Sequence, residues 1–167
     1  MPFKVMILLG SQSDLDATQG GTEFLRQFAV PFTLRIASAQ RSPEAVQRLV
    51  RDFESHGGQV IICVAGMSAQ LPGVVAALTC LPVVAVPIAG PVTAGLDALF
   101  SMIQMPQGTP VATMGFGKSG FSNAALLAVQ VLALNDVGLG QKFKEFKAGL
   151  ARDVAATDEK HRIDYRV

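Results

Sequence analysis

Three short segments hold the side chains best suited to bind a phosphorylated small molecule. In each, small and hydroxyl residues lead directly into an expected helix, whose first backbone N–H groups and positive end attract phosphate. Arg41 can bind a phosphate through two hydrogen bonds, and Asp14 can accept hydrogen bonds from ribose hydroxyls. The alternative is that these hydroxyls only cap helices. The three segments are Gly10-Ser11-Gln12-Ser13-Asp14, Ser38-Ala39-Gln40-Arg41-Ser42-Pro43 and Ala65-Gly66-Met67-Ser68-Ala69-Gln70-Leu71-Pro72-Gly73.

Each segment directly follows a short apolar run that is typical of a buried parallel strand. These runs are Phe3–Leu9, Phe32–Ala37 and Gln59–Ala65. In open α/β sheets, ligands bind outside the carboxyl ends of the strands. We therefore expect the three segments to meet at one edge of a sheet and to form a site for a ribonucleotide or a sugar phosphate.

The rest of the chain continues the alternation of strand and helix patterns, which favours a doubly wound α/β sheet. Two more strands are expected, at Val83–Pro87 and Pro110–Met114. The length predicts one domain over residues 1–167, with a core at about 3–135 and a helical tail at about 139–167. The expected helices are Asp14–Phe28, a segment beginning at Ser42-Pro43 and ending near His56, Leu71–Leu78, Gly95–Ile103, Asn123–Leu134 and the charged stretch from Gln141.

Charge is distributed very unevenly along the chain. Residues 55–135 contain only two charged side chains, Asp97 and Lys118, although 16% of the whole chain is charged. Prolines at four positions between Leu71 and Leu96 argue against a membrane-spanning helix in this stretch. A lone domain needs more charge to cover its surface, so we interpret the segment as core and subunit interface and predict an oligomer.

Composition also excludes several classes of partner. The net charge is +1, without long basic or acidic blocks, so we expect neither nucleic-acid nor membrane binding. The first residues lack the pattern of a secretory signal, which favours a cytoplasmic protein. Cys63 and Cys80 lack metal-ligand spacing and are expected to be buried as small apolar residues. No metal and no cofactor are predicted.

The three segments closely resemble the active-site loops of a known family. The family is that of N5-carboxyaminoimidazole ribonucleotide mutase, the AIR carboxylase family of purine biosynthesis, and the resemblance runs from about Phe3 to Leu134. The matching motifs are Gly10-Ser11-x-Ser13-Asp14, Ser38-Ala39-x-Arg41-Ser42-Pro43, Ala65-Gly66-x-x-Ala69-x-Leu71-Pro72-Gly73, Met105-Pro106-x-Gly108-x-Pro110-Val111 and Asn123-Ala124-Ala125-Leu126-Leu127-Ala128.

This resemblance implies a flavodoxin-like three-layer α/β subunit, a homo-octamer and a substrate built on 5-aminoimidazole ribonucleotide. Carried over by position, Ser11, Asp14 and Arg41 contact the ribose and the phosphate, and Ser13 and Ser38 line the same pocket. The third loop is expected to close over the imidazole ring with the residues Gly66, Ser68, Ala69, Gln70 and Leu71.

The chain departs from the family at the position that matters most for chemistry. Gln40 stands where the family has a histidine, and Gln70 stands where many members have a second one. The family reaction moves a carboxylate from the exocyclic nitrogen to ring carbon C4, whose proton must be transferred. A histidine suits that transfer because its pKa lies near the operating pH, whereas a glutamine amide does not titrate usefully. Lys118 resembles a family position and is the candidate substitute proton carrier, with Asp14 and Cys63 as weaker ones.

Three interpretations of the function follow from this departure. The chain is a mutase of the family whose activity is residual or rescued by another group. Alternatively, it is a divergent paralogue, a carboxylase or decarboxylase that acts on another nucleotide or acid. The third interpretation is a nucleotide-binding assembly protein without catalysis.

Overall fold

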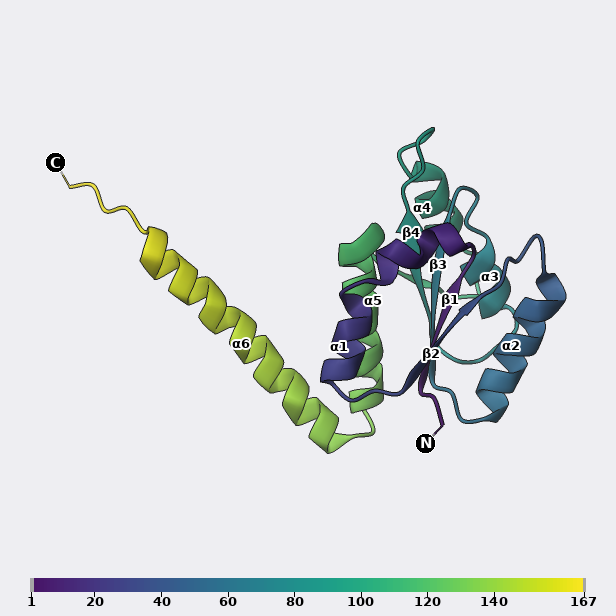
Figure 1. Ribbon diagram of the computed structural model, residues 1–167, viewed down its shortest axis with the longest axis horizontal. Coiled ribbons are helices and arrows are strands. Elements are labelled where there is room, and N and C mark those ends of the chain that lie inside the picture. Colours follow the sequence, from purple (N-terminus) through teal and green to yellow (C-terminus); the bar gives the residue numbers. More distant parts are fainter. Residues whose placement is uncertain (1, 167) are drawn as a thin grey trace.

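The computed structural model describes residues 2–166 and is built around a five-stranded parallel sheet (Figure 1). The strand order is β2-β1-β3-β4-β5, so the chain builds the sheet outward first to one side of β1 and then to the other. This reversal leaves a crevice beside the carboxyl ends of β1 and β3, where ligands of such sheets bind. The strands are β1 (Val5–Leu9), β2 (Phe32–Ile36), β3 (Val60–Gly66), β4 (Val83–Ile88) and β5 (Ala112–Thr113).

Helices cover both faces of the sheet, as predicted for a doubly wound α/β fold. One face carries α1 and α5, and the other carries α2, α3 and α4 (Figure 1). The short 3₁₀ helix η1 lies between β1 and α1. The helices are η1 (Gln12–Thr18), α1 (Gly21–Gln27), α2 (Pro43–Ser55), α3 (Leu71–Ala76), α4 (Leu96–Ile103), α5 (Gly117–Ala133) and α6 (Val137–His161).

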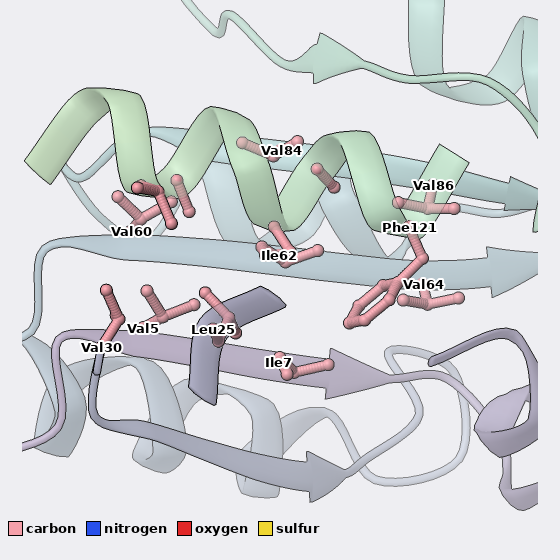
Figure 2. Packing of buried hydrophobic residues seen from close by; sticks show 14 of the residues in the cluster. Val5, Ile7, Leu25, Val30, Val60, Ile62, Val64, Val84, Val86 and Phe121 are labelled. Atoms are coloured by element: carbon pink, nitrogen blue, oxygen red, sulfur yellow. The ribbon is translucent and has the colours of Figure 1, made fainter. Parts of the chain in front are cut away.

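Alternation along β1 shows why its sequence is apolar at every position. Val5, Ile7 and Leu9 belong to the core under α1 and α5, whereas Met6 and Leu8 belong to the core under α2, α3 and α4. All five side chains are fully buried, because successive side chains of a strand point to opposite faces and both faces here are covered. Figure 2 shows the first of these cores, with side chains of β1, β3, β4, α1 and α5 packed together.

The structure corrects two expectations about the elements. The predicted helix Asp14–Phe28 is divided into η1 and α1, because Gly20 between them has a φ of +79°, which a continuing helix does not allow. Cys80 is exposed rather than buried, since it lies in the turn between α3 and β4 instead of inside an apolar element. Cys63 in β3 is buried as predicted.

The helix α6 begins on the body of the molecule and then runs away from it (Figure 1). Its first part is anchored by Phe143 and Phe146, which pack on Phe24 of α1 and on Phe28 at its end with ring centroids 5.6–5.7 Å apart. Beyond residue 150 its side chains are exposed, including the apolar Val154. The predicted homo-octamer stays a prediction. Among residues 2–166, none of the helices has both the length and the apolar character needed to cross a membrane.

Candidate functional site

A cavity of about 550 Å³ opens at the carboxyl ends of β1, β2 and β3. It is formed by the three loops that follow these strands, which are the three segments singled out in the sequence. Eleven of the twelve predicted site residues line it. They are Ser11, Ser13, Asp14, Ser38, Gln40, Arg41, Gly66, Ser68, Ala69, Gln70 and Leu71, and Gly10, Ala39, Ala65 and Met67 complete the lining.

The first loop presents a carboxylate to the cavity. Ser11 caps η1, and the Asp14 carboxylate accepts a hydrogen bond from the Ser11 backbone N–H at 3.0 Å, so the two residues form a capping box. The Ser13 hydroxyl lies 3.3 Å from the second carboxylate oxygen. Although Asp14 is only 6% exposed, it lines the cavity, and its remaining lone pairs can accept hydrogen bonds from ligand hydroxyls.

Burial raises the pKa of the Asp14 carboxyl above its ordinary value of 3.8, although hydrogen bonds from Ser11 and Ser13 act in the opposite direction. The folded state therefore holds this proton more tightly than the unfolded state, so stability is lost as the pH rises from about 3.8 through the native pKa. We expect Asp14→Asn to raise the free energy of unfolding at neutral pH, and this gain should vanish below the ordinary pKa. Urea denaturation of both proteins across about pH 3 to pH 7 measures the difference, and a gain that does not change with pH would contradict it.

The second loop holds its shape through serine hydroxyls and carries the cation of the site. Ser38 Oγ accepts hydrogen bonds from the backbone N–H groups of Gln40 and Arg41, and Ser42 Oγ accepts one from the Ser38 N–H. The Arg41 guanidinium donates to the Gly10 carbonyl oxygen at 3.4 Å and thereby joins the second loop to the first. Its other N–H groups are available to an anion, because a guanidinium carries five donors.

The third loop brings an apolar side chain to the mouth of the cavity. Met67 lines the cavity, is 75% exposed and has a φ of +57°, a left-handed conformation that costs a non-glycine residue energy. The sequence places Met67 in the third segment but not among its expected site residues, because nothing in its residue type marks a ligand contact. Two residues further on, Ala69 is buried in the core that also contains Leu71 of α3.

Gln40 of the second loop and Gln70 of the third loop meet across the cavity. Gln40 Nε2 donates a hydrogen bond to Gln70 Oε1 at 3.4 Å, although the two residues are 30 positions apart in the chain. This contact joins the second loop to the third. A neutral amide pair therefore lies at the side of the cavity where the second and third loops face each other.

The predicted substitute proton carriers are not equally placed. Lys118 lines a separate groove between α1, α5 and α6, where its ammonium group contacts Asp16 at 3.1 Å and Gln19 at 3.2 Å. Cys63 is fully buried in β3, and burial raises the pKa of its thiol far above the ordinary range, so it stays protonated. Asp14 is the one of the three that lines the cavity.

The chain also contains one glycine-rich segment with the spacing of a dinucleotide-binding turn, which was not among the motifs predicted to form a site. Residues 115–120 have the spacing G-x-G-x-x-G, which follows β5 and forms the beginning of α5. Here the spacing serves packing, because a Cβ at Gly120 would collide with the carbonyl group of Gly115. A dinucleotide site needs this turn inside a strand-helix-strand unit, but β5 lies at the edge of the sheet and α5 leads into α6.

Comparison with known proteins identifies the family to which the chain belongs. A sequence model described as AIR carboxylase matches residues 4–153, nearly the whole chain. The chain belongs to the AIR carboxylase family. This confirms the family predicted from the three loop motifs and its connection to purine biosynthesis.

Individual members of the AIR carboxylase family align with nearly all of this chain. It is 44% identical to the N5-carboxyaminoimidazole ribonucleotide mutase of Methanocaldococcus jannaschii, over 93% of this chain and 96% of the relative. It is 40% identical to the mutase of Escherichia coli, over 95% of this chain and 90% of the relative. The crystal structure of Treponema denticola PurE superimposes with a TM-score of 0.88 at 28% identity, over 98% of this chain and all of the other.

Proposed function

We propose that this chain binds an aminoimidazole ribonucleotide in the cavity between the three loops, and that its ordinary mutase reaction is strongly impaired. The observation that carries the proposal is the composition of the cavity. It contains a guanidinium, a buried carboxylate and two amides, but no imidazole among its lining residues within the described range 2–166. Such a set is able to hold the ligand, yet it lacks the usual proton carrier.

The charged side chains suit the polar end of a ribonucleotide. Arg41 can bind phosphate by charge-assisted hydrogen bonds, and it lies beside the start of the 13-residue helix α2, whose positive end also favours an anion. Asp14 can accept hydrogen bonds from the ribose hydroxyls. The imidazole ring then extends toward Gln40, Gln70 and Met67, which leaves its C4 atom beside the amide pair.

The chemistry of the family reaction explains why an amide impairs it. Carboxylation at C4 requires removal of the C4 proton, and the reverse step requires its delivery. A general acid or base typically accelerates such a step by about 10²–10⁴-fold when its pKa lies near the operating pH. Gln40 keeps the reach and hydrogen bonding of the family histidine, so ligand binding survives while proton transfer is lost.

Arg41→Ala is expected to weaken binding of an aminoimidazole ribonucleotide by about 1.5–3 kcal/mol, because charge-assisted hydrogen bonds to the phosphate are lost. Isothermal titration calorimetry measures the change. Arg48→Ala is the matched control, since Arg48 is an exposed arginine of α2 that does not line the cavity. Equal affinities of the Arg41 and Arg48 variants for the ribonucleotide would show that Arg41 does not bind the phosphate.

The hydrogen bond between Gln40 and Gln70 favours one second candidate, a divergent paralogue that acts on another nucleotide or acid. The bonded pair presents hydrogen-bond donors and acceptors to the cavity at fixed places. Such a polar surface can select a ligand other than the family substrate.

A further inference from the structure

We infer that the Gln40–Gln70 pair selects a ribonucleotide whose ring carries a neutral primary carboxamide over one that carries a carboxylate. The inference rests on the proposed function, since it takes the bound ring to lie beside this pair. It concerns the group attached to C4, which is the position where the family's substrates and products differ.

The hydrogen-bonding groups of the pair define the preference. Each amide has one carbonyl oxygen and one NH₂ group. The bond from Gln40 Nε2 to Gln70 Oε1 leaves the Gln40 carbonyl oxygen as an acceptor, and it leaves the Gln70 NH₂ group and the second N–H of Gln40 as donors. Both side chains line the cavity. If the oxygen and nitrogen of both amides are interchanged, Gln70 donates to Gln40 instead, and the free carbonyl oxygen then belongs to Gln70 and the free NH₂ group to Gln40.

A primary carboxamide complements this surface fully. Its NH₂ group donates to the free carbonyl oxygen, and its own carbonyl oxygen accepts from the free NH₂ group, so both partners are satisfied while the glutamines keep their mutual bond. A carboxylate offers acceptors only. It can accept from the free N–H groups of the pair, but it leaves the free glutamine carbonyl oxygen without a donor and places its negative charge beside that oxygen.

The charge of the cavity acts in the same direction. Among the lining residues of the described chain, Arg41 is the one cation and Asp14 the one anion. The phosphate of a ribonucleotide occupies Arg41, so a second anionic group on the ring lacks a cationic partner. A carboxylate gives up part of its hydration on entering the cavity without gaining a cation in return, whereas the neutral carboxamide does not carry this cost.

The test is calorimetric titration of the unmodified protein with 5-aminoimidazole-4-carboxamide ribonucleotide and, separately, with the corresponding 4-carboxylate. We expect the carboxamide to bind at least about tenfold more tightly, as one or two hydrogen bonds that only it forms would give. Gln40→Met and Gln70→Met keep the length of the side chain and remove the amide, so each should reduce this ratio toward one. A carboxylate that binds as tightly as the carboxamide to the unmodified protein would overturn the inference.

The outcomes separate this inference from the function on which it rests. Equal, measurable binding of both ligands leaves the ribonucleotide site standing and overturns only the role of the amide pair. Absence of binding by both ligands overturns the ribonucleotide site and the inference together. A preference for the carboxamide that persists in both methionine variants also overturns the inference, because another feature would then cause it.

Discussion

Replacing Gln40 with histidine is expected to raise the rate of carboxylate transfer on N5-carboxyaminoimidazole ribonucleotide by about 10²–10⁴-fold. The physical reason is that an imidazole can take up and release a proton near neutral pH, whereas an amide cannot. Position 40 lines the cavity and reaches the opposite loop through Gln70, so a histidine of similar length lies within reach of the same ligand. Single-turnover NMR with purified protein measures the rate.

Gln40→Asn is the matched control for this prediction, because it changes the side chain but keeps a non-titrating amide. Its rate should remain at the level of the unmodified protein. Efficient turnover by the unmodified protein would contradict the account, since another group would then carry the proton. Asp14, which lines the cavity, and Lys118, which lies in the neighbouring groove, are the next positions to substitute.

Phe121→Ala is expected to lower the free energy of unfolding by about 3–5 kcal/mol, the usual cost of removing a buried aromatic ring. Phe121 is fully buried and points from α5 toward Val64 of β3 (Figure 2). Its ring also fills the space above Gly21, where an added Cβ would collide with it. Urea denaturation measures the change through the transition midpoint.

Phe3→Ala is the matched control, because it makes the same change of residue type at a phenylalanine that is half exposed. Substitutions at such surface positions usually change stability by less than about 0.5 kcal/mol. A Phe121 variant that is no less stable than the Phe3 variant would show that α5 is not held on the sheet by this ring.

The sheet and the loops of the site could be predicted from sequence because their signals are local. The strands β1 and β3 are uninterrupted apolar runs, and the loops that follow them begin at Gly10 and at Gly66. The parallel order follows from the helices between the strands. The division of η1 from α1 was missed, because the pattern of apolar residues continues across Gly20 and only its backbone angle breaks the helix.

The contacts between loops could not be predicted, because they depend on where distant segments meet. Gln40 and Gln70 were each marked as departures from a family pattern, but no local signal states that their side chains would bond to each other. Lys118 is a second example. It was predicted from its resemblance to a family position, and in the folded chain it pairs with Asp16 in a groove apart from the cavity.

The most direct test of the central claim is an NMR titration of the unmodified protein with 5-aminoimidazole ribonucleotide, with the Arg41→Ala variant measured in parallel. We expect saturable binding of one ligand per chain, with contacts from the protein to both ribose and ring protons, and clearly weaker binding by the variant. Absence of binding to the unmodified protein would contradict the account, because the cavity between the three loops would then serve a different ligand.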